Sequence, residues 1–153
     1  MKTVASVLRL ALLVALSAAI LPRLAAQTTR SELLFALGSA AKSHDAAALR
    51  ECFHFDGTDP ELAKSIRRTI DQITTWSVPV VFTSERTGRG PLELKQNGKS
   101  YTLNGEWTFQ IHIHRGPPPS KGFVFPAGLT PGGKNRILLT VEKKEIQPRA
   151  SNN

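Results

Sequence analysis

The sequence predicts an α+β fold, in which three N-terminal helices pack on a curved antiparallel sheet. Between residues 29 and 76 apolar residues recur at helical spacing, whereas beyond Trp76 they alternate with polar residues as in strands. Helices followed by a run of strands are typical of the α+β class. The chain has 153 residues, 41% of them apolar and 21% charged, which is the composition of one globular domain.

Each predicted helix has a start signal. Thr29 and Glu32 have the spacing of a capping box, and the apolar stripe after them is Leu33, Leu34, Leu37 and Ala41. Asp45 is a good N-cap for a second helix that runs to Cys52 and Phe53. Asp59-Pro60 opens the third helix, because Pro suits the first helical position. The apolar face of that helix is Leu62, Ile66, Ile70 and Ile73.

The strands are predicted from alternation and turn signals. Pro79 places the start of the strand around residues 78–83 at a sheet edge or a sheet rim, because proline cannot donate to a ladder. Asn97-Gly98 predicts a hairpin turn, and Asn104-Gly105 predicts another turn. A last hairpin turns at residues 131–133, and its apolar positions are Phe123, Phe125, Ile137, Leu139 and Val141.

The segment 106–114 carries the clearest two-faced strand. Its apolar face is Trp107, Phe109, Ile111 and Ile113, which we expect to pack against the third helix. His112 and His114 then lie on the opposite, wetter face. Burying each large apolar side chain is worth roughly 1.5–3 kcal/mol, whereas burying the polar face would leave unsatisfied groups at roughly 1–3 kcal/mol each. We therefore expect a firmly set register.

The N-terminal residues 1–26 have the layout of a secretory signal peptide. Lys2 gives a positive start, residues 10–21 are a largely apolar run without charge, and Pro22 and Ala26 precede the expected cut. We expect an exported product, periplasmic or extracellular, that begins at Gln27 and has no stable membrane span; an uncleaved anchor is the alternative. Residues 27–147 are then a single domain, and residues 148–153 a disordered tail.

Charge and cysteine content exclude several classes. Removing residues 1–26 takes three of the twenty basic residues and leaves seventeen against twelve acidic ones, a net charge of +5 instead of +8. The basic residues form no block interleaved with aromatics, so a nucleic-acid partner is not expected. The single cysteine, Cys52, excludes an internal disulfide scaffold and a Cys-rich zinc site.

The stretch Lys42–Gly57, KSHDAAALRECFHFDG, resembles the second-helix region of the nuclear transport factor/ketosteroid isomerase-like superfamily, the cystatin-like cone. The resemblance extends over about residues 28–145 and implies a cone of helices against a curved sheet. Its enzymatic members use an Asp or His–Asp arrangement inside the cone. Here the nearby acids are Asp56 and Asp59, whose roles as turn former and N-cap explain them, so the fold is carried over and the catalysis is not.

Four residues remain as candidates for an acid–base pair: His54, Asp56, His112 and His114. His112 and His114 lie two apart on a strand and point the same way, so both could face one metal ion. The segment also resembles the Gly…His-x-His opening of cupin metal sites. The glutamate expected after His114 is missing, however, and Pro131 stands where a further histidine is expected. We therefore predict no metal and no cofactor.

Two functional hypotheses follow. The leading one is an exported, non-catalytic domain that binds a small apolar ligand or a protein partner, with a homodimer left open. The alternative is a small isomerase or dehydratase that uses an Asp/His pair. A Cys52–His54 nucleophilic pair would need a third orienting group, and Cys52 is expected to be buried as a small hydrophobe.

Overall fold

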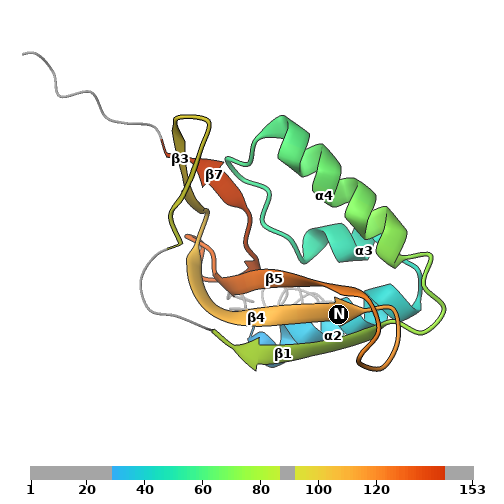
Figure 1. Cartoon of the computed structure of the whole chain (residues 1–153). Coiled ribbons are helices and arrows are strands. Elements are labelled where there is room, and N and C mark those ends of the chain that lie inside the picture. The colour runs from blue at the N-terminus through green and yellow to red at the C-terminus, as the bar shows by residue number, and fades with distance from the viewer. Residues whose placement is uncertain (1–28, 87–91, 144–153) are drawn as a thin grey trace, which may run out of the picture.

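The computed structural model describes residues 29–86 and 92–143, which form a mixed fold of helices and antiparallel strands (Figure 1). The helices are α2 (Arg30–Lys42), α3 (Ala46–Glu51) and α4 (Pro60–Ile73). The α+β class is therefore confirmed. The predicted signal peptide and C-terminal tail lie outside the described residues. Within them, no helix combines the length and apolarity that crossing a bilayer requires.

The helix starts lie where the sequence predicted them. Thr29 and Glu32 form a capping box, with Thr29 Oγ1 accepting from the Glu32 backbone at 3.1 Å and Glu32 Oε2 accepting from the Thr29 backbone at 2.6 Å. The Asp45 side chain accepts from the Ala48 N–H at 3.0 Å, and the Asp59 side chain accepts from the first turn of α4. These carboxylates satisfy N–H groups that the helices themselves leave without partners.

The described strands form two sheets, where the sequence predicted one. The large sheet has the order β1-β4-β5-β6, with β1 (Val80–Glu85), β4 (Glu106–His114), β5 (Gly122–Leu129) and β6 (Asn135–Ile137). The small sheet has the order β2-β3-β7, with β2 (Leu94–Gln96), β3 (Lys99–Leu103) and β7 (Thr140–Glu142). The expected last strand is split because Leu138 and Leu139 are both buried, which breaks the alternation between β6 and β7.

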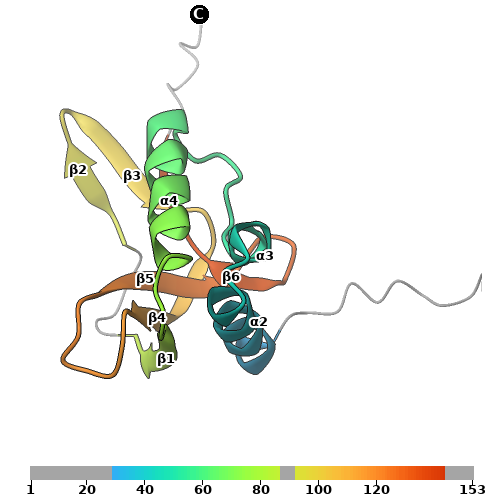
Figure 2. The ribbon, with the colours of Figure 1, turned by 90° about the vertical axis from the view of Figure 1, so that its right-hand side faces the viewer.

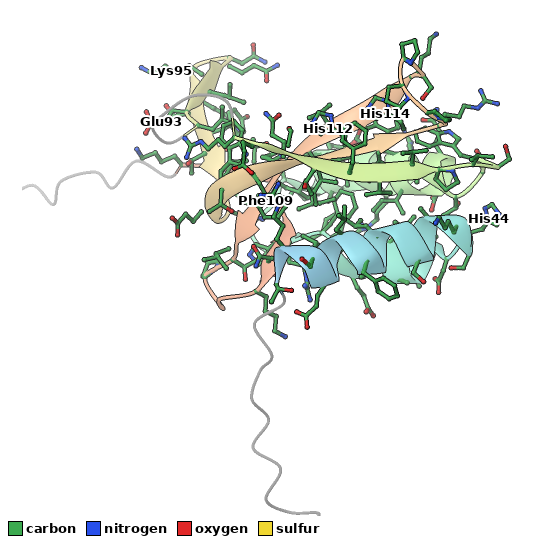
Figure 3. The ribbon with its side chains drawn as sticks, turned by 90° about the horizontal axis from the view of Figure 1, so that it is seen from below. His44, Glu93, Lys95, Phe109, His112 and His114 are labelled. Carbon is green, nitrogen blue, oxygen red and sulfur yellow. The ribbon has the colours of Figure 1, made fainter. Side chains whose placement is uncertain are left out.

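The core lies on the face of the large sheet that α2 covers, here called the inner face (Figure 3). Phe109, Ile111 and Ile113 of β4 are at most 3% exposed and share one cluster with residues of all three helices. Ile113 lies opposite Val81 and Phe123 in the ladders, so the inner face continues across β1 and β5. The expected inner face of β4 is confirmed at these three positions.

Trp107 is a correction to that prediction. It is only half-buried and lies outside the core cluster, because the ladder between β4 and β5 shifts between Trp107 and Phe109. Such a bulge breaks the strict alternation of faces. The indole instead donates a hydrogen bond to the Phe109 carbonyl at 2.8 Å. The guanidinium carbon of Arg86 lies over the indole, 4.6 Å from the ring centroid.

The third helix contributes to the core through its C-terminal half. Ile70 and Ile73 are fully buried, and Ile66 is partly buried against the same cluster. Leu62 differs: it lines a hollow with Leu94 and Tyr101 of the small sheet. Figure 2 shows α4 beside the β2–β3 hairpin. The N-terminal half of α4 therefore lies next to the small sheet, and its C-terminal half belongs to the core.

Candidate functional site

The two strand histidines lie on the outer face of the large sheet, the face opposite α2 (Figure 3). This placement agrees with the sequence prediction. The Phe82 ring stacks on His112 at 4.6 Å between centroids, with 8° between the ring planes, and lies 5.3 Å from His114. Together with Ser84 and Gln110 these residues form what we call the outer-face cluster: Phe82, Ser84, Gln110, His112 and His114.

Hydrogen bonds hold both imidazoles in place. His112 Nε2 lies 2.8 Å from Ser84 Oγ, and the Ser84 hydroxyl donates to Gln110 Oε1 at 3.3 Å. On this hydrogen-bond network the ring proton is assigned to His112 Nε2, so that Ser84 Oγ accepts from it. His114 Nδ1 donates to the Ser120 carbonyl at 2.8 Å, since a carbonyl can only accept. Each ring therefore has a defined orientation on the sheet.

The Ser84–His112 contact resembles a nucleophile–base pair in distance alone. In such a pair the serine hydroxyl donates to the imidazole, and a third group orients the base. Here the hydroxyl donates to Gln110, and the hydrogen bonds of both rings go to Ser84 and Ser120. Sequence reasoning missed Ser84, although alternation from Phe82 places it on the same face. Its meeting with His112 depends on the β1–β4 register.

The second candidate pair, His54 and Asp56, meets at the rim of an open groove of about 870 Å³. His54 Nδ1 lies 3.9 Å from Asp56 Oδ2, and the Asp56 side chain is 90% exposed. Water therefore solvates this carboxylate. Asp56 and the outer-face histidines are not brought together, because β5 and β6 separate β4 from the Phe53–Ile137 bridge beside His54.

Cys52 is buried, as predicted, and is a poor nucleophile. Burial raises the pKa of its thiol to about 11, against the opposing charge of Arg136. The Sγ–H points to the Ala48 carbonyl at 3.5 Å. Because the reactive species is the thiolate, the thiol form that persists at neutral pH does not support a Cys–His pair.

Asn104 has a structural role that the sequence did not predict. The pair Asn104-Gly105 predicted only a turn. Its Nδ2 donates to the carbonyl of His54 at 2.6 Å and to that of Asp56 at 3.2 Å. Its Oδ1 accepts from the Leu139 N–H at 3.0 Å. This one side chain therefore joins the α3–α4 link, the β3–β4 turn and the β6–β7 connection, and it shapes the groove beside His54.

Comparison with known proteins adds no relative. Family models, curated proteins and solved structures were searched, and none of them matches this chain. Over residues 29–86 and 92–143, no three His, Cys, Asp or Glu side chains gather in a way that could hold a metal ion.

Proposed function

We propose that this chain is an exported, non-catalytic domain that binds a partner protein on the outer face of its large sheet. The observation that carries the proposal is the contrast between the two faces. The inner face is filled by side chains of the core cluster, whereas the outer-face cluster borders solvent. In a cystatin-like cone, a small apolar ligand would lie between helices and sheet. That space holds Leu37, Ile70 and Ile111, each 0% exposed, which favours an external partner.

The outer face has the composition of a protein-binding surface. Phe82 and Val124 flank His112 on either side in the ladders, so an apolar and aromatic row crosses β1, β4 and β5. Val124 is 53% exposed, so a branched apolar side chain of this row faces solvent. Aromatic and apolar side chains surrounded by polar ones are typical of interface centres.

The partner that fits is an extended, acidic segment added beside β1. β1 is an edge strand of the large sheet, so one side of its backbone pairs with no described strand. An extended peptide can pair with such an edge, and its alternate side chains then lie along one face of the sheet. The chain has a net charge of +8, or +5 for residues 27–153, and exposed Arg115 and Lys121 follow the His114 end of the cluster. These charges favour an acidic partner.

A peptide titration tests this proposal. The probe is a peptide of about six residues, the usual strand length, that alternates phenylalanine and glutamate; its control replaces each glutamate by lysine. We expect the acidic peptide to shift the NMR signals of β1 and β4 amides. Phe82→Ala should weaken binding about tenfold, the effect of losing an aromatic interface residue. Val78→Ala, at an exposed residue before β1, should leave it unchanged.

Three results would refute the proposal: no shifts with the acidic peptide, equal binding of the lysine peptide, or shifts confined to the groove at His54. The last result would favour the alternative, an isomerase or dehydratase built on His54 and Asp56. An acid–base pair of that kind works best in an enclosed site where burial adjusts its proton affinity. The exposed Asp56 carboxylate does not support it.

A further inference from the structure

Helix α2 has apolar residues on two faces. The buried face is Leu33, Leu37, Ala40 and Ala41, which pack in the core. On the other side Phe35 is 79% exposed, the most exposed of the large hydrophobic residues of the described chain. A surface helix normally turns polar residues to water, and a helix that is apolar all round is normally covered. The exposed residues of α2 are Ser31, Glu32, Phe35, Ala36, Ser39 and Lys42, so one aromatic ring lies among small and polar side chains, an arrangement typical of interface centres.

The outer side of α2 is also shaped for packing. Two hollows, of about 440 Å³ and 500 Å³, share Phe35 and Ser39 in their lining. Phe35 thus forms a ridge between them. Gly38 follows one turn later, and a Cβ at that position would meet no atom within 4 Å. A bulky ring beside an empty glycine position is the arrangement in which one helix can receive a side chain of another.

Four residues on this side of α2 form a line, here called the seam, that can pack against the same line of a second copy. Ser31, Phe35, Gly38 and Lys42 follow at spacings of four, three and four, the spacing of a two-helix seam. If a second α2 lies antiparallel, with a two-fold axis midway between Phe35 and Gly38, each Phe35 faces the Gly38 of the other copy. The same axis brings Lys42 beside Ser31 and Glu32 of the other copy, which pairs opposite charges at both ends.

We propose that α2 is the interface of a homodimer, in which Phe35 of each copy packs on Gly38 of the other. A two-fold interface must use one surface patch twice, which this seam allows. With 13 residues, α2 is about 20 Å long, so the contact is at the small end of specific interfaces. We therefore expect a reversible dimer with a dissociation constant in the micromolar range. The proposal does not depend on the partner-binding surface proposed above, because the outer-face cluster lies on the side of the large sheet opposite α2 (Figure 3).

Sedimentation velocity over an about hundredfold range of concentration tests the interface. The purified chain should shift from the monomer mass towards twice that mass. Phe35→Ser should raise the dissociation constant at least tenfold. Because the side chain is exposed, the variant should keep its fold, which circular dichroism checks. Val78→Ser, another exposed apolar residue, should dimerise as the unmodified chain does. A monomer at every concentration, or a dimer indifferent to Phe35→Ser, would overturn the proposal.

Cross-linking tests the antiparallel orientation. Cys52 is buried and has a raised pKa, so a cysteine introduced on α2 is the site that a short bismaleimide reaches. A mixture of Ser31→Cys and Lys42→Cys chains should give cross-linked dimers, and either variant alone should give few. Cross-links within each single variant would overturn this arrangement. The proposal would also be overturned if the chain stayed monomeric but bound anionic lipid vesicles through Phe35, because the exposed side of α2 would then be a membrane-binding surface.

Discussion

Replacing Asn104 by alanine is expected to lower the free energy of unfolding by about 2–6 kcal/mol. The truncation leaves the Leu139 N–H and the His54 carbonyl without their partners, at 3.0 and 2.6 Å in the native protein. Both bonds are partly buried, and an unsatisfied group of this kind costs about 1–3 kcal/mol. The Asp56 carbonyl belongs to an exposed residue, so water replaces its bond at little cost.

The isosteric variant Asn104→Asp separates hydrogen bonding from packing. Its side chain can still accept from the Leu139 N–H, but it places a carboxylate oxygen against the His54 carbonyl. This repulsion should raise the pKa of the introduced carboxyl above its unfolded value of about 3.9. A raised pKa means that stability is present below the unfolded value and is lost as pH rises through the folded one. Asn104→Asp should therefore be near native at about pH 3.5 and destabilised at about pH 7.

Urea melts of both variants at these two pH values measure the effect. Gln72→Ala, on the exposed face of α4, is the control and should stay within about 0.5 kcal/mol. The deficit of Asn104→Ala should be similar at both pH values, because that side chain does not titrate. The reasoning fails if Asn104→Ala costs less than about 0.5 kcal/mol, or if the deficit of Asn104→Asp is the same at both pH values.

Three further predictions concern the core and the thiol. Ile111→Ala should cost about 2–5 kcal/mol in urea melts, because Ile111 is fully buried, whereas His112→Ala on the outer face should cost about 1 kcal/mol or less; the reverse order would place the histidines inside. Gly128→Ala should cost about 3 kcal/mol or more in thermal melts, because an added Cβ would overlap the Glu106 carbonyl oxygen; a native-like melting temperature would show that the β4 bulge can shift. Cys52 should resist iodoacetamide in the native protein at about pH 8 and react in urea, as mass spectrometry can show; rapid native labelling would contradict its burial and the raised pKa of about 11.

Local signals in the sequence were enough to predict where the helices begin and, at Phe109, Ile111 and Ile113, which face of β4 is buried. A capping box, an N-cap aspartate and an Asp-Pro pair act within one turn of the chain, so Thr29, Asp45 and Asp59 could be assigned without knowing the fold. The burial of Ile111 and Ile113 follows from alternation alone, because a strand with one apolar face has a single favourable side.

Features that depend on pairing between distant segments could not be predicted. Alternation near residue 82 does not say which side is inner, and Val81, not Phe82, packs against the core. The bulge at Trp107 arises from the partner strand β5, and the meeting of Ser84 with His112 follows from the β1–β4 register. Likewise, the sequence around Asn104 predicts only a turn, because its bonding partners at residues 54 and 139 are distant in the chain and meet it only in the fold.

The division into two sheets has a consequence for local unfolding. The small sheet buries little: all of β2 is exposed, and Leu103 is its one buried strand residue. Among the described residues, the ion pairs Lys99–Glu142 and Lys143–Glu93 link the small sheet at its surface, and such pairs between exposed side chains contribute little to stability. Segments with few buried apolar contacts open at a lower free energy than the core. The amide hydrogens of β2 and β3 should therefore exchange with solvent through local opening, whereas those of β4 and β5 should exchange only when the whole domain unfolds.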